Sequence, residues 1–396
     1  MVSHMAPFVP MPPMLASLLS HGGAGVDAFF VLSGLVIVQS LQAHGWRRMP
    51  FLAARARRIF PVFLPVFAFA VAVQALDGLS DGGVWETMPW IASDSPARSI
   101  WSIGWPHDWP VSIAAHLVMA HGVFPDGVMP GAWVGFLGAA WSLSTEWQFY
   151  LLAAAAAPLI RRDRDGLAAF ATALLALAAA GAAWQALAPP SLTFSRAFLP
   201  NKATYFALGV ASVPVLRKGL TCPAPTALFS AVLVATLLLC SANGVDKLAV
   251  PLAWVAVLAA QTGAGGRAPV LLTTAWLGRW LTGRALLWLG AVSYPLYLVN
   301  EPVQKLLGRA LAIAAHGNAL LFGLAWVPGA LLLPLGLAWL LHIWIERPMQ
   351  RRGSTYGAAG GRVVGARAEG LCAAPGWISR THSRDTSIPT SRSPMG

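Results

Sequence analysis

Nine long runs of apolar residues constrain the fold of this chain more than any other feature. A helix that crosses a bilayer needs about 20 mostly apolar residues. Backbone polar groups must be paired within lipid, and the runs show no two-residue alternation, so helices are favoured over a barrel. The sequence therefore predicts an all-α polytopic membrane protein. The runs lie near 25–43, 59–76, 133–157, 166–187, 202–216, 226–241, 248–262, 287–306 and 318–345.

The composition supports this fold class. Of the 396 residues, 57% are hydrophobic and 11% are charged, whereas a soluble domain carries about 25% charged residues. An ordinary soluble enzyme and a disordered chain are therefore excluded. The net charge of +12 could indicate nucleic acid, but the basic residues stand between apolar runs, so no nucleic-acid partner is expected. Cys222, Cys240 and Cys372 show neither pairing nor zinc-type spacing, which predicts no metal site.

Charge between the runs predicts the orientation. The segment 44–57 holds four arginines and no acid, and basic residues recur in 161–164, 217–218, 267–284 and 347–352. The segment 77–132 holds six acids against the single base Arg98. Cytoplasmic loops are rich in Lys and Arg. Every basic loop then falls on the cytoplasmic side, provided that the short stretch Val111–Val123 is interfacial or re-entrant, and the C-terminus is cytoplasmic.

Both ends of the chain depart from the pattern of spans. Four prolines within residues 1–20 break any long helix there, so most of a first helix is expected to be missing. Residues 353–396 are rich in Gly, Ser, Arg and Thr without apolar periodicity, which predicts a disordered tail. The predicted transmembrane domain covers 1–352, with about nine visible helices, or ten if a truncated first helix is restored.

Polar side chains enter the apolar runs at four places, where ionisable groups are costly and often functional. Asp27 lies in GVDAFFVLSG, residues 25–34, although an acid near a helix start is also stabilised by the helix dipole. Arg55 and Arg58 lie in RARRIFP, residues 55–61. They share one helical face and suit phosphate binding, although basic residues there also signal topology.

The other two polar segments open or interrupt later runs. Residues 141–150, WSLSTEWQFY, place Ser142, Glu146 and Tyr150 at the start of a span, with Glu146 and Tyr150 facing the same way. The alternative is a satisfied structural network. Residues 293–302, SYPLYLVNEP, again bury polar groups, and here a kinked packing helix is the alternative.

In this order and spacing, these segments, with YFALG at 205–209 and WIERPMQRR at 344–352, resemble the acyltransferase 3 family over Gly25–Arg352. The resemblance implies about ten helices in the bacterial cytoplasmic membrane. It also implies an acyl-CoA donor, with acetyl as the acyl group by analogy, no metal, and a carbohydrate or lipid-linked glycan as acceptor. The rival function is a multi-span transporter or flippase without covalent chemistry, which polar residues at membrane depth also fit.

The family's first helix carries an arginine and, about ten residues later, a catalytic histidine. His4 stands where that histidine falls, whereas His21 lies beside Gly22 in the expected external loop. The arginine has no counterpart in this chain, so an inactive truncated acyltransferase is a further alternative. Two more positions depart from the family: Asn300 has no histidine nearby, and Trp147 stands where a second carboxylate is often found.

These residues suggest a mechanism for acyl transfer to a hydroxyl group. His4 is expected to act as general base or to carry the acyl group transiently. Arg55 and Arg58 would hold the coenzyme A phosphates at the cytoplasmic mouth. Either Asp27 or Glu146 would orient His4 or pair with an arginine, and the sequence leaves both options open.

Charge that develops on the thioester oxygen needs hydrogen-bond donors as well. Ser142 and Tyr150 are the candidate donors, since both lie in the polar segment that opens a span. The resemblance further implies that the donor binds on the cytoplasmic side while the acceptor is reached from the opposite face.

Overall fold

The computed structural model describes residues 2–19, 21–79, 83–101, 104–162, 165–220, 222–262 and 283–350. All of them belong to one compact unit, Met1–Val363. The predicted tail 353–396 lies outside the described residues, as do Arg267, Arg279 and Cys372. Within the described ranges the chain forms helices and turns without a strand, and Pro125 and Phe194 make an isolated β-bridge.

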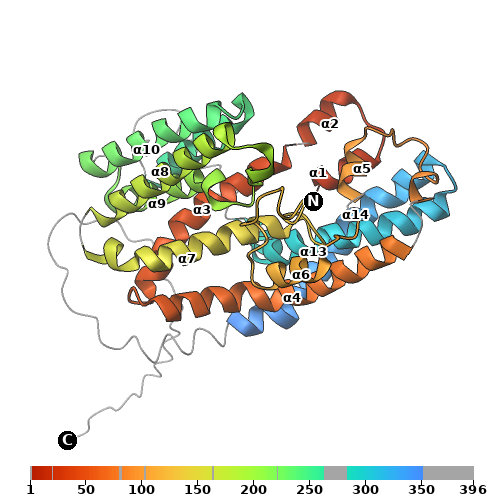
Figure 1. Cartoon of the computed structure of the whole chain (residues 1–396), viewed down its shortest axis with the longest axis horizontal. Coiled ribbons are helices and arrows are strands. Elements are labelled where there is room, and N and C mark those ends of the chain that lie inside the picture. The colour runs from red at the N-terminus through yellow and green to blue at the C-terminus, as the bar shows by residue number, and fades with distance from the viewer. Residues whose placement is uncertain are drawn as a thin grey trace, which may run out of the picture. The chain divides into compact units, whose positions relative to one another are not determined.

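Each of the nine predicted runs contains a helix (Figure 1). Among the described residues, five stretches are long and apolar enough to cross a membrane: Met14–Ala43, Arg48–Leu76, Gly166–Leu187, Pro223–Ser241 and Ala319–Gln350. The all-helical membrane class is thereby supported, while the count of nine or ten spans stays a prediction. The nine helices are α3 (Gly22–Ala43), α4 (Arg48–Leu79), α7 (Ala140–Arg162), α8 (Gly166–Leu187), α9 (Ala203–Lys218), α10 (Pro223–Ser241), α11 (Ala249–Gln261), α13 (Arg284–Ala315) and α14 (Ala319–Leu341).

Short elements precede the first long helix: α1 (Val2–Met5), the 3₁₀ turn η1 (Ala6–Phe8) and α2 (Pro13–Leu19). Prolines divide this segment as expected, and Pro13 opens α2, where a missing N–H costs nothing. The segment is nonetheless anchored. Phe8 is fully buried against Trp326, whose indole Nε1 donates to the Met5 carbonyl at 3.1 Å.

The acidic segment between α4 and α7 holds three short helical elements: η2 (Gly83–Trp85), α5 (Pro96–Trp101) and α6 (Trp109–Leu117). Helix α6 has nine residues and is therefore about 14 Å long, less than half of the roughly 30 Å hydrocarbon core. The chain turns after it at Met119, whose φ is 58°. Helix α6 is thus too short to cross, in agreement with an interfacial or re-entrant stretch.

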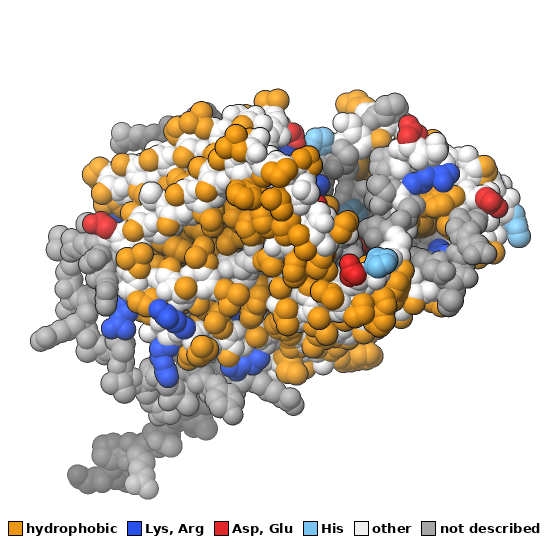
Figure 2. Space-filling view, in the orientation of Figure 1, with side chains coloured by type: hydrophobic (Ala, Val, Ile, Leu, Met, Phe, Trp, Pro, Cys, Tyr) orange, Lys and Arg blue, Asp and Glu red, His pale blue; other side chains and the backbone are white. Residues whose placement is uncertain are grey.

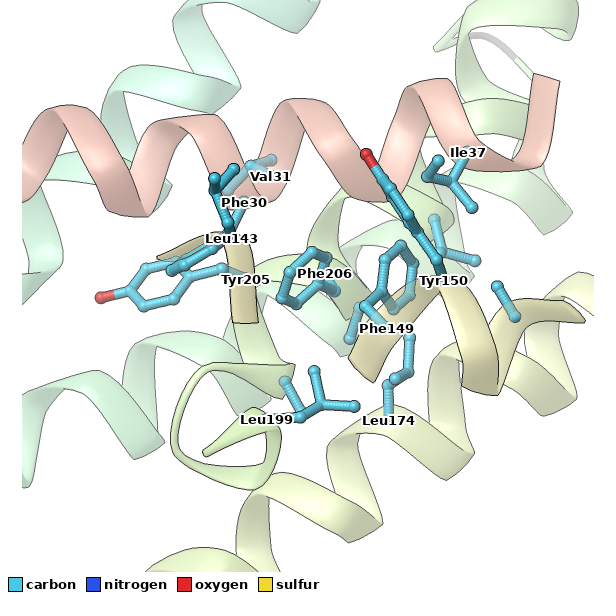
Figure 3. Packing of buried hydrophobic residues seen from close by; sticks show 14 of the residues in the cluster. Phe30, Val31, Ile37, Leu143, Phe149, Tyr150, Leu174, Leu199, Tyr205 and Phe206 are labelled. Carbon is cyan, nitrogen blue, oxygen red and sulfur yellow. The ribbon is translucent and has the colours of Figure 1, made fainter. Parts of the chain in front are cut away.

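Helices α3 and α9 approach at backbone distance because glycines face each other. A Cβ on Gly209 would lie 2.0 Å from the Val31 carbonyl oxygen, and one on Gly34 would lie 2.3 Å from the Phe206 oxygen. Small residues allow this close approach between membrane helices. Figure 3 shows Phe206 beside Phe149 of α7, with 4.1 Å between ring centroids. This core holds α3, α7 and α9 in fixed register.

Basic side chains gather where several long helices end. The Arg48 guanidinium at the start of α4 donates to the Ala155 carbonyl late in α7 at 3.3 Å. Arg217 at the end of α9 donates to Gln42 at the end of α3. Figure 2 shows blue side chains concentrated at the lower left of this face, next to an extended hydrophobic surface. We call this part of the bundle the basic end.

Candidate active site

The polar start of α7 is first of all a structural junction. The Ser144 hydroxyl donates to the Met119 carbonyl at 2.8 Å and accepts from the Gly122 amide at 3.1 Å. The Gln148 amide nitrogen donates to the Ala197 carbonyl at 2.9 Å. Both loops that cover α7 are thereby fixed to it. The structural alternative for this segment therefore accounts for Ser144 and Gln148. Ser142, Glu146 and Tyr150 instead contact other helices or each other.

Glu146 of α7 is a buried carboxylate, 6% exposed. One oxygen accepts a hydrogen bond from the Ser33 hydroxyl of α3 at 3.0 Å and a second from the Tyr150 hydroxyl one turn later. In Figure 3 the Tyr150 oxygen points toward α3. Arg55 and Arg58 of α4 lie close enough to stabilise the negative charge of Glu146. The structure thus brings together four residues that were predicted from separate motifs.

The two arginines differ in surroundings. Arg55 is half-buried; its Nη2 donates to the Ser40 hydroxyl at 2.8 Å, and its guanidinium lies 5.9 Å from the ring centroids of Phe51 and Tyr150. Its buried Nε has no hydrogen-bond partner among the described residues. Arg58 is exposed. Arg55 is therefore the more buried of the two, while Arg58 is exposed and still acts electrostatically on Glu146.

Two tyrosines of α13 extend the polar contacts away from the basic end. The Tyr294 hydroxyl donates to the Ile59 carbonyl at 2.7 Å. The Tyr297 hydroxyl accepts from the Ser142 hydroxyl at 2.9 Å. Tyr297 interacts electrostatically with both Glu146 and Glu301, so it lies between the two carboxylates. The sequence marked this segment as polar without singling out either tyrosine.

Glu301 of α13 is a functional candidate that the sequence analysis missed. It is 5% exposed, and its Oε2 accepts from the Ala139 amide at 3.0 Å, directly before α7. Its Oε1 lies 3.3 Å from the Lys305 Nζ. An acid at a helix N-terminus satisfies a free N–H and meets the positive end of the dipole. This anchor holds the start of α7 at Ala140, one residue before the segment 141–150 that was predicted to open a span.

His4 of α1 lies near this carboxylate. Burial lowers the pKa of the imidazole, and the charge of Glu301 partly offsets that effect while Lys305 adds to it. The buried Nδ1 of His4 has no hydrogen-bond partner within the part of the chain that the structure describes. His21, the competing histidine, is exposed and bonds to the Ser17 carbonyl at 2.8 Å. Of the two histidines, His4 alone faces buried charged groups.

Asp27 has a partner that the sequence did not indicate. Its carboxylate lies 2.7 Å from the Nζ of Lys202, just before α9, and both side chains are largely buried. Asp27 also interacts with the Tyr205 hydroxyl. Glu301 and Lys305 are among the groups that act on His4, whereas Arg55 and Arg58 act on Glu146. The sequence left open whether Asp27 or Glu146 pairs with an arginine, and in the structure Glu146 is the one that lies near arginines.

Taken in order, these contacts form a file of polar groups along the antiparallel helices α7 and α13. From the basic end it runs through five sites: the pair Arg55 and Arg58, the pair Glu146 and Tyr150, the pair Ser142 and Tyr297, the pair Glu301 and Lys305, and His4. Among the described residues no group of three or more His, Cys, Asp or Glu side chains could hold a metal ion. The file is chemically equipped to bind anions at one end and to move a proton at the other.

Residues 1–343 match a family model described as an acyltransferase domain, Acyl_transf_3. The matched region contains every residue of the polar file. No curated protein and no solved structure matches the chain.

Proposed function

The chain belongs to the acyltransferase 3 family and is a membrane acyltransferase; we propose that it moves an acyl group from acyl-CoA to a hydroxyl group of a glycan or lipid-linked glycan. The observation that carries this proposal is the polar file, which extends from a pair of arginines to His4, whose Nδ1 is buried. A general base and an anion-binding group are what transfer from a coenzyme A thioester requires.

The donor is proposed to bind at the basic end. Arg55 and Arg58 supply guanidinium groups suited to the phosphates of coenzyme A. The unpaired Nε of Arg55 leaves a donor for such an anion among the described residues. With basic loops on the cytoplasmic side, the protein lies in the bacterial inner membrane and the donor enters from the cytoplasm. Acetyl is the proposed acyl group.

The acceptor is proposed to react near His4. The imidazole takes the proton of the acceptor hydroxyl as its oxygen attacks the thioester carbonyl carbon. The tetrahedral intermediate collapses, the carbon–sulfur bond breaks, and the coenzyme A thiolate leaves and takes up the proton. Glu301 stabilises the transient imidazolium and acts as a positioning residue. The buried, unpaired Nδ1 of His4 and the nearby Glu301 carboxylate support these roles.

The developing oxyanion needs donors between the two ends. The pair Ser142 and Tyr297 supports this role, because its hydroxyl groups lie between Glu146 and Glu301. Tyr150 is committed to Glu146 in this state, so it is proposed to organise that carboxylate. Asp27 and Lys202 are proposed to fix α3 against the start of α9.

The test uses the full chain in proteoliposomes that also contain the host's membrane glycans, supplied with radiolabelled acetyl-CoA. Wild type is expected to transfer label into the glycan fraction, and His4→Ala to reduce transfer at least 100-fold. His21→Ala is the matched control, because His21 is an exposed histidine of the same segment. Arg55→Gln is expected to raise the KM for acetyl-CoA with a smaller effect on kcat.

Two outcomes would contradict the proposal. Equal label transfer by wild type and His4→Ala would remove His4 from the mechanism. Vesicles that accumulate a glycan without any loss of thioester would instead identify a transporter.

A further inference from the structure

A cavity of about 350 Å³ lies outside the polar file, within the segment 104–135. Small-molecule sites fall in the range of about 300–1,000 Å³, so this cavity has the size of a site for one compact ligand. Its polar lining comes from His107, Asp108 and Ser112, and Trp105 is the aromatic residue of the lining. The segment belongs to the acidic part of the chain that the charge distribution places opposite the basic loops.

Ser112 lines this cavity and carries a buried hydroxyl group. The residue is 2% exposed, and its Oγ has no hydrogen-bond partner among the described residues. A buried polar group without a partner costs stability. Gly135, another lining residue, lies next to this hydroxyl: a Cβ at position 135 would stand 3.5 Å from the Ser112 Oγ, at ordinary contact distance. The hydroxyl is therefore placed to bond a ligand.

Two buried imidazoles connect the wall of the cavity to the polar file. The Nδ1 of His116 lies 2.7 Å from the Ser112 carbonyl oxygen. The rings of His116 and His121 stack at 3.9 Å with 3° between their planes. The Nε2 of His121 lies 3.2 Å from the Ala140 carbonyl oxygen. The preceding amide, that of Ala139, is held by Glu301. The cavity thus adjoins the end of the file where the acceptor is proposed to react.

We propose that this cavity binds one neutral pyranose unit of the acceptor, an inference that rests on the proposed acyl transfer. Trp105 is 41% exposed and held edge-on by Phe136, with 5.2 Å between ring centroids, so it offers a fixed apolar face for sugar C–H groups. Asp108 accepts from sugar hydroxyls, and Ser112 donates to or accepts from them. No Lys or Arg belongs to the described lining, and Asp108 repels anions, which disfavours uronic acids.

Binding is tested on the full chain in nanodiscs by saturation-transfer NMR. The probes are the methyl β-glycosides of glucose, galactose and N-acetylglucosamine, with methyl β-glucuronide as the anionic counterpart. We expect saturation transfer to at least one neutral glycoside and at least fivefold less to the glucuronide. The expected ratio reflects repulsion by Asp108 and the absence of Lys and Arg from the described lining, where the Nδ1 of His107 lies 3.3 Å from the Asp108 carboxylate.

Two variants separate recognition from folding. Ser112→Ala is expected to abolish saturation transfer to the neutral glycoside. It should not lower the midpoint temperature of unfolding, because the hydroxyl has no partner to lose among the described residues. Gly135→Ala narrows the same space at ordinary contact distances and is expected to weaken binding at least fivefold. Gly336→Ala is the matched control, because a Cβ there meets nothing within 4 Å. The proposal would be overturned if no neutral glycoside showed saturation transfer, or if saturation transfer were unchanged in both variants.

Acyl transfer to the membrane glycans, measured in parallel, distinguishes this proposal from the one on which it rests. If wild type transfers the acyl group and Ser112→Ala leaves the KM for the acceptor unchanged, the cavity is not the acceptor site and the acyltransferase function stands. If glycoside binding depends on Ser112 while no acyl transfer occurs, the acyl-transfer proposal fails and the sugar site stands.

Discussion

Acidification is expected to destabilise the fold through the buried pair His116 and His121. Burial lowers the pKa of His116 from 6.5 to about 4, and burial likewise places that of His121 well below 6.5. Above pH 6.5 both rings are neutral in the folded and the unfolded chain, so their contribution to stability is fully present. As the pH falls below 6.5, only the unfolded chain takes up protons, and stability is lost.

The magnitude follows from proton linkage. Each imidazole reduces the free energy of unfolding by about 1.4 kcal/mol per pH unit in this window. For His116 the loss reaches about 3 kcal/mol near pH 4, where the folded state begins to protonate as well. Most carboxylates titrate below pH 5, so the interval from pH 7.5 to 5 reports mainly on the histidines.

The assay is reversible unfolding in mixed micelles, followed by tryptophan fluorescence at half-unit steps of pH. His116→Phe supplies the comparison, because the ring of His116 already stacks on Phe67 at 5.1 Å and a phenyl ring can keep that contact. The variant is expected to be less stable at pH 7.5, since its bond to Ser112 is lost, and to show a shallower pH dependence. A free energy of unfolding that stays constant from pH 7.5 to 5, or equal slopes in both proteins, would refute the reasoning.

Three further substitutions address the site and the bundle. Glu301→Gln keeps an acceptor for the amide before α7 but removes the charge that raises the pKa of His4. The acidic limb of the pH profile of kcat/KM should therefore move to lower pH. An unmoved limb would show that Glu301 does not act on the base. Gly209→Ala forces a Cβ to 2.0 Å from the Val31 oxygen and should cost about 1–3 kcal/mol or more of unfolding free energy, whereas unchanged stability would contradict the close approach. Lys202→Met leaves the Asp27 carboxylate buried and unpaired and should cost about 3–5 kcal/mol, most of which the added change Asp27→Asn should restore.

The positions of the long helices were predictable because each depends on local apolar composition. A run of about 20 apolar residues has few alternatives to a helix in lipid. Helix α7 begins at Ala140, one residue before the polar segment 141–150 that was predicted to open the span, and residues 133–139 of the apolar run are held in turns. The carboxylate that fixes this boundary, Glu301, is 162 positions away along the chain, and local patterns carry no information on such a contact.

The candidate site was predictable only in part for the same reason. The four-residue spacing of Glu146 and Tyr150 placed them on one face, and the structure joins them. The partner of Asp27 is 175 positions away, and one lysine among several basic residues gave no signal of pairing. The proximity of His4 to Glu301 likewise depends on how α1 packs against the end of the bundle.

Glu301 has a consequence for the energetics of proton transfer. Both of its oxygens are already engaged, one by the amide before α7 and the other by Lys305, so the carboxylate has little freedom to rotate. A positive charge that appears on the His4 ring meets a countercharge, the Glu301 carboxylate, whose position is already fixed. The reorganisation energy that water would add to such a charging step is therefore small. In this arrangement the rigidity of a helix cap becomes electrostatic preorganisation.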